Sequence, residues 1–261
     1  MHEDPPGEDR QDGERGSRDD PSAAGGVMPA AVSTRDGGNS SAIAVFPQTK
    51  FHRPPVRDEH VERSLLLDAI EASRARIVVV TAPPGFGKST LLAQWSARCA
   101  DPDRVVWVSL DADDSGARLW SAVLTGLREL LGPGLDPALD AAEAPEADLR
   151  TGVLIALLDA LAATPEPVTL ILDDLHLALR DAATSDSLDW VLARLPSTHR
   201  VLVASRRDLG LDALGRLRIQ GDVLDLRADD LRFADDEALR FLRDRLGLEL
   251  DPADVAALEQ R

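Results

Sequence analysis

The sequence predicts an α/β fold in which a five-stranded parallel sheet carries helices on both faces. Short apolar runs alternate along the chain with segments of helical periodicity, which is typical of parallel strands joined by helical crossovers. The first run is apolar without alternation, as expected for a strand that is buried on both faces. A glycine-rich segment, residues 82–89, directly follows the first run and opens a helix. The predicted strands are residues 76–81, 104–110, 168–174, 200–206 and 223–226.

Helices are predicted between the strands from apolar residues spaced three to four positions apart. The first covers residues 61–70 and precedes the first strand, and the last two, 235–246 and 252–260, close the chain. Residues 132–145 contain three prolines and are predicted to be a loop, whereas residues 207–222 are predicted to be a short connector. The remaining predicted helices are residues 88–99, 117–131, 147–162 and 185–195.

Residues 82–89, with the sequence APPGFGKS, have the layout of a phosphate-binding P-loop between a strand and a helix. Gly85 and Gly87 lack a Cβ atom, so the backbone can curl and turn successive N–H groups inward. The N-terminal end of the following helix adds unpaired N–H groups and a positive dipole. The pattern normally opens with glycine, and Ala82 in that place indicates a variant loop. The sequence therefore predicts a P-loop NTPase with the phosphate-binding residues Ala82, Pro83, Pro84, Gly85, Phe86, Gly87, Lys88 and Ser89.

The use of lysine supports the same site. The chain contains two lysines, Lys50 and Lys88, among 29 lysine and arginine residues. Lys88 stands where a compact ammonium charge, rather than a forked guanidinium, suits the outer phosphates of a nucleotide. The neighbouring hydroxyl of Ser89 is predicted to ligate Mg²⁺.

Three further charged residues are predicted at the carboxyl ends of strands, where a parallel sheet binds its ligand. Asp173 is expected to hold Mg²⁺ directly or through water, and Asp174 to orient or deprotonate the attacking water. Asp174 is one methylene shorter than the glutamate that fast ATPases often carry, so slow turnover is expected. Arg206 is predicted to sense the terminal phosphate, with Arg207 as the alternative. Loop capping by the aspartates and a surface salt bridge of Arg206 are the competing interpretations.

The composition limits the partners of the 261-residue chain. A net charge of −17 argues against binding to a nucleic-acid backbone or an anionic membrane surface. No stretch has the length and apolarity of a membrane span, and the N-terminus lacks a secretory signal pattern, so a cytoplasmic location is expected. Cys99 is the single cysteine, which excludes a disulfide within the chain. Residues 1–48 are poor in hydrophobic side chains and are predicted to be a disordered tail.

A set of segments extends the P-loop and the acidic strand in a fixed order. It consists of residues 50–55, 60–63, 82–95, 107–111, 170–176, 214–218 and 226–233. In this order and spacing the set resembles the nucleotide-binding domain of the large LuxR-type transcriptional regulators related to the maltose-regulon activator. These regulators belong to the STAND class of signal-transduction ATPases. An alanine at the first position of the P-loop and an Asp-Asp pair are usual in that family.

The resemblance implies roles that the residues alone do not reveal. Val61 and Arg63 would lie against the adenine, and Lys88, Ser89 and Thr90 would hold the phosphates and Mg²⁺. Proteins of the family bind ATP and an inducer, and then self-associate to activate transcription. DNA would be bound only by a C-terminal region that lies beyond residue 261, so no direct contact between this segment and nucleic acid is expected.

The chain is expected to comprise the tail at residues 1–48, a P-loop ATPase domain at residues 49–233 and the start of a helical lid at residues 234–261, where it is truncated. We expect an ATP-binding switch module that binds Mg-ATP, hydrolyses it slowly and self-associates. A stand-alone P-loop ATPase or kinase with true turnover is the alternative. A kinase would need further basic residues over the transferred phosphoryl group, and the sequence shows no second basic-rich lid.

Overall fold

The sheet and its helices lie in the part of the chain that the computed structural model describes, residues 46–57, 60–144, 148–234 and 237–238. These residues belong to one unit of the chain, Ser40–Arg261. The predicted tail up to residue 45 and the predicted helix 252–260 lie outside the described residues. The same holds for the predicted helix 235–246, apart from residues 237–238.

Five parallel strands form one sheet in the order β2-β3-β4-β1-β5, which confirms the predicted fold class. Strand β1 pairs with β4 and β5, so that Val79 lies opposite Val203 on one side and Asp225 on the other. This order brings the carboxyl ends of β1, β3 and β4 together at one edge of the sheet. The strands are β1 (Ile77–Thr81), β2 (Val105–Ser109), β3 (Thr169–Asp173), β4 (Arg200–Ser205) and β5 (Val223–Arg227).

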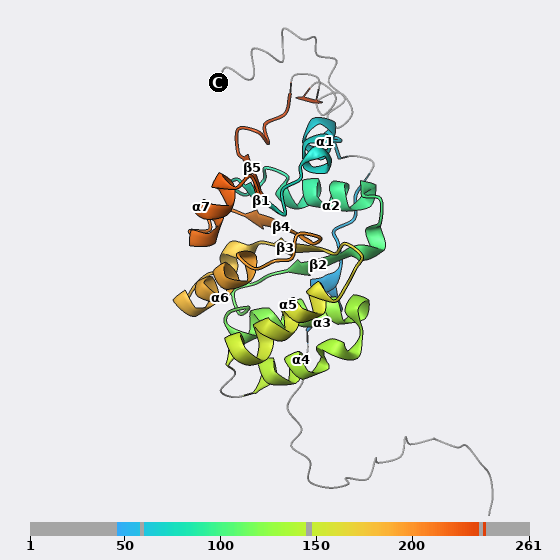
Figure 1. The fold of residues 1–261 in the computed structure, drawn as a ribbon. Coiled ribbons are helices and arrows are strands. Elements are labelled where there is room, and N and C mark those ends of the chain that lie inside the picture. The colour runs from blue at the N-terminus through green and yellow to red at the C-terminus, as the bar shows by residue number, and fades with distance from the viewer. Residues whose placement is uncertain (1–45, 58–59, 145–147, 235–236, 239–261) are drawn as a thin grey trace, which may run out of the picture. The chain divides into compact units, whose positions relative to one another are not determined.

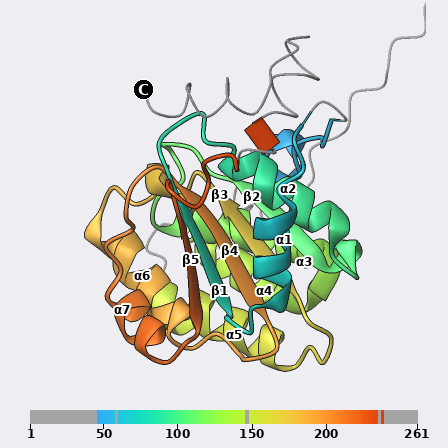
Figure 2. The same cartoon turned by 90° about the horizontal axis from the view of Figure 1, so that it is seen from above.

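Successive residues of β1 to β4 enter opposite hydrophobic cores, which explains why these strands are mostly apolar. In β1, Ile77 and Val79 pack with α3 to α7, whereas Val78 and Val80 pack with α1 and α2. Figures 1 and 2 show α1 and α2 together on one face of the sheet. The helices are α1 (Ser64–Ala72), α2 (Lys88–Arg98), α3 (Ala117–Leu131), α4 (Asp136–Glu143), α5 (Ile155–Ala162), α6 (Ala182–Leu192) and α7 (Asp212–Ile219).

The predicted loop at residues 132–145 is wrong, because it contains α4 and a preceding 3-10 turn, Pro133–Leu135. Pro133 and Pro137 lie in the first turns of these two elements. A proline is tolerated there because its missing N–H would have no partner inside the helix, so it starts helices as readily as it breaks them. Ala138 and Ala142 of α4 are buried in the core beside α3.

The predicted connector at residues 207–222 is also wrong, because it contains α7. This helix is short, and its buried stripe consists of Ala213, Leu214 and Leu217. Its first turn is held from another helix, since the N–H of Ala213 donates to Oδ1 of Asp189 at 2.8 Å. A helix of two turns whose N-terminal partner is distant in sequence leaves little periodic signal.

The chain that precedes α1 is anchored by Lys50, the second of the two lysines. A 3-10 turn, Gln48–Phe51, buries Lys50 against the loop that follows β2. Its ammonium forms ion pairs with Asp111, at 2.8 Å, and with Asp114, whose side chain is fully buried. Phe46, which the sequence predicts to be part of the tail, is buried within 5.8 Å of this ammonium. Lys50 is therefore a structural cation of the described fold.

Candidate functional site

The loop between β1 and α2 begins at Ala82, which is buried and donates its N–H to the carbonyl of Ser205 at 3.2 Å. Positive φ angles occur in this loop at Gly85 (88°) and Gly87 (76°), and not at Ala82. Alanine at position 82 is therefore free of backbone strain, whereas residues other than glycine are disfavoured at positions 85 and 87. A Cβ at Gly85 or Gly87 would meet no protein atom within 4 Å. The backbone angle, rather than packing, requires glycine there.

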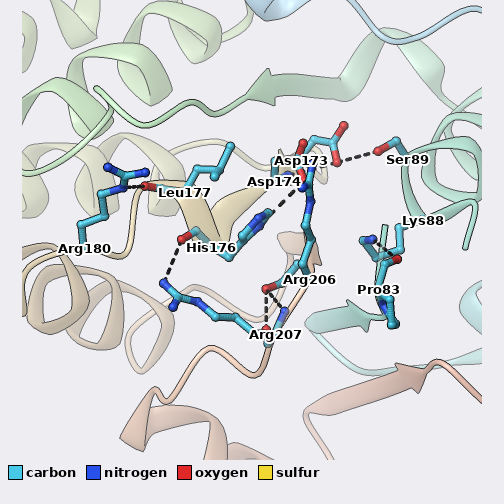
Figure 3. A network of polar contacts seen from close by, with 11 residues as sticks. Pro83, Lys88, Ser89, Asp173, Asp174, His176, Leu177, Arg180, Arg206 and Arg207 are labelled. Carbon is cyan, nitrogen blue, oxygen red and sulfur yellow. Dashed lines mark hydrogen bonds and ion pairs between the residues drawn. The ribbon is translucent and has the colours of Figure 1, made fainter. Parts of the chain in front are cut away.

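The first turn of α2 presents the two functional side chains of the loop. Lys88 is buried, and its ammonium donates to the carbonyl of Pro83 at 3.0 Å. Burial lowers the pKa of Lys88, while the carboxylates of Asp174 and Asp173 act in the opposite direction. The hydroxyl of Ser89 donates to Oδ1 of Asp173 at 2.9 Å, so the two predicted Mg²⁺ ligands are already joined (Figure 3).

Asp173, the last residue of β3, and Asp174, which follows it, have different environments. Asp173 is buried, and burial raises the pKa of its carboxyl even though Ser89 and the N–H of Asp174 both donate to it. Asp174 has a φ of 54°, and it is the non-glycine residue with a positive φ among those that the structure describes. Its Oδ1 lies 3.7 Å from Nε of Arg206 and 3.8 Å from Nδ1 of His176 (Figure 3).

The structure separates the two arginines that follow β4. Arg207 donates from Nη2 to the carbonyls of His176, at 3.2 Å, and Leu179, at 3.4 Å, and so ties β4 to the segment after β3. Arg206 lies beside Asp174 and lines the cavity in front of the P-loop. Of the two arginines, Arg206 therefore lines the cavity, whereas Arg207 is bonded to the backbone.

Two neighbouring cavities open at this edge of the sheet and share Gly85, Gly87 and Thr90. The smaller, about 190 Å³, lies between the P-loop and the pair Asp174 and Arg206. Its wall contains Pro84, Gly85, Gly87, Lys88, Ser89, Thr90, Asp174 and Arg206. Ala82 lies under the loop, Pro83 contributes its carbonyl to Lys88, and Asp173 reaches the site through Ser89.

The larger cavity, about 360 Å³, adjoins the smaller one and has a mostly apolar wall. It includes Val61, Arg63 and Phe86, which the sequence assigns to the nucleotide. The residues that sequence reasoning missed are His60, Leu231, Arg232 and Phe233. The sequence signal for Leu231, Arg232 and Phe233 is the segment 226–233, and that for His60 is the segment 60–63. Both segments carry the family resemblance but contain no motif with a chemical meaning of its own.

None of the helices in the described residues combines the length and the apolarity that a transmembrane segment needs.

Comparison with known proteins identifies relatives of the ATPase part. Residues 53–204 match the AAA ATPase domain family. The chain is 34% identical over 217 residues to the serine/threonine-protein kinase PknK of Mycobacterium tuberculosis. It is 30% identical over 202 residues to the HTH-type transcriptional regulator MalT of Cronobacter sakazakii. The matches span 81% and 76% of this chain but 19% and 22% of the two relatives.

A solved structure supports the fold. The Walker-type ATPase of Pyrococcus abyssi superposes with a TM-score of 0.51, covering 79% of this chain and 65% of that chain. The two sequences are 14% identical, so the likeness concerns the fold alone.

Proposed function

This chain belongs to the AAA ATPase domain family and is related to MalT, and on that basis we propose that it is the Mg-ATP-binding switch module of a MalT-like transcription regulator. One observation carries the proposal. The P-loop glycines, Lys88 and Ser89 line one cavity of about 190 Å³, with Arg206 and Asp174 on its opposite wall. Amide groups and cations that converge on a cavity of this size suit a chain of phosphates.

The residues around this cavity fit a magnesium-bound nucleotide. The oxygen atoms of Ser89 and Asp173, 2.9 Å apart, are both available as ligands. Mg²⁺ commonly takes one or two protein oxygens and completes its shell with phosphate and water. The described residues form no cluster of three or more His, Cys, Asp or Glu side chains that would make an all-protein cage. Bound there, Mg²⁺ would neutralise the charge that develops on the transferred phosphoryl group.

Asp174 and Arg206 are the residues that we assign to hydrolysis. Asp174 lines the cavity with its carboxylate and would hold a water molecule and accept its proton. Its positive φ is compatible with a functional position, because aspartate tolerates this conformation better than most residues. The guanidinium of Arg206 would bind the terminal phosphate by charge-assisted hydrogen bonds. The base would occupy the larger cavity beside Val61 and Phe86.

The assignment to a regulator rests on the relation to MalT. The chain spans only about a fifth of the length of MalT and of PknK, so the activity of the whole protein is part of the proposal. We propose that this segment self-associates when ATP is bound, in the cytoplasm, and that DNA is contacted only by a region outside residues 1–261. The net charge of −17 supports the last point, because a nucleic-acid-binding surface needs clustered cations.

Binding and hydrolysis measurements separate the switch from the alternative of a stand-alone ATPase or kinase. Calorimetry with Mg-ATP is expected to give a saturable heat. Steady-state hydrolysis is expected to stay well below the ~1 s⁻¹ of ordinary enzymes, because Asp174 replaces the longer glutamate. Absence of binding by folded protein would contradict the site. Sustained turnover near ~1 s⁻¹ without a partner would favour the alternative.

Asp173→Asn tests the buried carboxylate. Asparagine keeps an acceptor for Ser89 and removes a charge that burial disfavours, so we expect Mg²⁺ dependence of nucleotide binding to disappear while thermal stability stays equal or rises. The pKa of the Asp173 carboxyl is raised in the fold, so at neutral pH its buried negative charge lowers the stability of the wild type. This loss of stability disappears as the pH falls through the folded-state pKa and the carboxyl becomes protonated. The melting temperatures of the wild type and Asp173→Asn should therefore converge as the pH is lowered from neutral. If they diverged, the buried carboxylate of Asp173 would not be the cause.

Arg206→Ala and Arg207→Ala form a matched pair. We expect Arg206→Ala to weaken ATP binding about tenfold and to leave ADP binding nearly unchanged, because one charge-assisted hydrogen bond to the terminal phosphate is lost. Arg207→Ala should leave both affinities unchanged, since its guanidinium is bonded to the carbonyls of His176 and Leu179. Titration calorimetry with each nucleotide measures the effect. Equal losses for ATP and ADP in Arg206→Ala would reject the sensing role.

A further inference from the structure

The guanidinium of Arg63 is buried and already engaged by the chain that leaves β5. Nη1 donates to the carbonyl of Leu231 at 2.9 Å, and Nη2 donates to those of Arg232, at 2.8 Å, and Asp230, at 3.5 Å. Nε pairs with the carboxylate of Glu237 at 3.2 Å, where both side chains are 8% exposed. An arginine carries five N–H donors, so most of them are taken by the protein itself.

Arg63 lines the larger cavity but is therefore poorly placed to read a base with its own donors. The contact with Phe233 supports the same conclusion, because the guanidinium lies 5.0 Å from the centre of the Phe233 ring, which also lines the cavity. Arg63 thus holds the backbone of residues 230–233 in the position that forms one wall of the cavity. Its contacts are those of a residue that positions a wall.

Glu237 extends this contact to the next turn of the chain. Its Oε2, the oxygen that lies 3.2 Å from Nε of Arg63, accepts the N–H of Ala234 at 3.0 Å, and the N–H of Ala238 donates to the carbonyl of Ala234 at 2.8 Å. Glu237 therefore caps a helical turn while it neutralises Arg63. In Figure 1 the chain that follows β5 lies near α1, which starts directly after Arg63.

The same arginine is linked to the P-loop helix. Gln94 of α2 donates from its side-chain amide to the carbonyl of Val61 at 2.9 Å and accepts the N–H of Arg63 at 3.4 Å. Both Gln94 and Arg63 are buried. A continuous series of hydrogen bonds thus joins α2, which carries Lys88 and Ser89, to the segment that contains Glu237.

We infer that Arg63 and Glu237 form a latch that couples nucleotide binding to the position of residues 230–234 and 237–238, with Arg63 acting as a positioning residue rather than as a reader of the base. The inference rests on the proposed nucleotide function of the same site. A latch that shapes the cavity wall must also be stabilised by whatever fills the cavity, because coupling between two sites is reciprocal. Nucleotide binding and closure of the Arg63–Glu237 pair should therefore strengthen each other.

Glu237→Ala in the full chain tests the latch. We expect Mg-ATP affinity to fall about tenfold, although Glu237 does not line the cavity, because Arg63 then loses its buried counter-charge and the wall loosens. Glu237→Gln keeps an acceptor for Arg63 and should recover part of the affinity. Asp229→Ala is the matched control, since Asp229 lies in the same segment with its carboxylate exposed and should have no effect.

Protection from trypsin cleavage by Mg-ATP distinguishes the proposed coupling from a purely structural role of the Arg63–Glu237 pair. Arg232 is exposed, and in the wild type Mg-ATP should slow cleavage between Arg232 and Phe233. In Glu237→Ala the same nucleotide, at saturating concentration, should give little protection. Arg63→Lys should weaken ATP and GTP binding by the same factor, because no base-reading donor is removed.

The outcomes are distinguishable. If the wild type bound no Mg-ATP, the proposed function would fail and the coupling with it. If the wild type bound Mg-ATP and Glu237→Ala matched it in affinity and protection, only the latch would be overturned. A selective loss of ATP over GTP binding in Arg63→Lys would overturn the positioning role and make Arg63 a base reader.

Discussion

Lys88→Ala is expected to weaken Mg-ATP binding about 100-fold, which corresponds to the loss of about 3 kcal/mol of charge-assisted hydrogen bonding. Lys88 is the lysine that lines the smaller cavity, and its ammonium is held at the P-loop by the carbonyl of Pro83. The fold should survive, because burial lowers the pKa of Lys88 and its charge is therefore a cost to the protein without ligand. Titration calorimetry measures the affinity, and thermal unfolding checks the fold.

Lys88→Arg is the control for charge alone. It keeps the positive charge but replaces a compact ammonium with a planar fork that is longer and bulkier. We expect it to bind Mg-ATP much more weakly than the wild type, since the longer guanidinium would have to fit where the ammonium of Lys88 now donates to the carbonyl of Pro83. Binding of either variant with unchanged affinity would mean that the phosphates lie elsewhere.

Lys50→Met is expected to lower the free energy of unfolding by about 3–5 kcal/mol, the usual cost of leaving a buried charge without its partner. The carboxylate of Asp114 is 0% exposed, and Lys50 is its closest cation, with Arg118 at 3.7 Å. Asp111, 57% exposed, can be solvated when the lysine is lost. Urea denaturation followed by the fluorescence of the tryptophans measures the change.

The double variant Lys50→Met, Asp114→Asn isolates the cause. It removes the orphaned charge together with its partner, so most of the lost stability should return. A single Asp111→Asn substitution should cost little by comparison, because that carboxylate is half-exposed. If Lys50→Met were as stable as the wild type, the ion pair would contribute nothing and the packing of Phe46 would have to anchor this segment.

The two lysines illustrate how far composition can lead. Their rarity among 29 basic residues marks both positions as special, and both are buried. The sequence attaches a chemical meaning only to Lys88, because a strand, glycines and a helix surround it. Lys50 acquires its meaning from Asp111 and Asp114, which are more than 60 positions away. Ion pairs of this kind depend on how the chain returns to itself, and no local pattern encodes them.

Local sequence patterns were sufficient to predict the strands and to predict which residues gather at the site. Strands β1 to β4 are mostly apolar because both of their faces are covered, and charged residues stand at the carboxyl ends of β3 and β4. Once such strands are parallel, the P-loop, the Asp173–Asp174 pair and Arg206 must gather at one edge of the sheet. The wrong predictions concern α4 and α7, which are both short. The prolines before and within α4 indicate a loop in the sequence, and the residue that bonds the first turn of α7 is distant along the chain.

By itself the sequence therefore determined the fold class, the relation to MalT-like ATPase domains and the residues that meet at the P-loop, because these depend on periodicity and on a motif read along the chain. Only the tertiary structure showed that Arg206 lines the cavity while Arg207 is bonded to backbone carbonyls, and that Arg63 is engaged by residues 230–232 and Glu237. Neighbouring arginines look alike in a sequence. Their different partners come from strands and segments that are distant along the chain, and only the folded backbone brings them within hydrogen-bonding range.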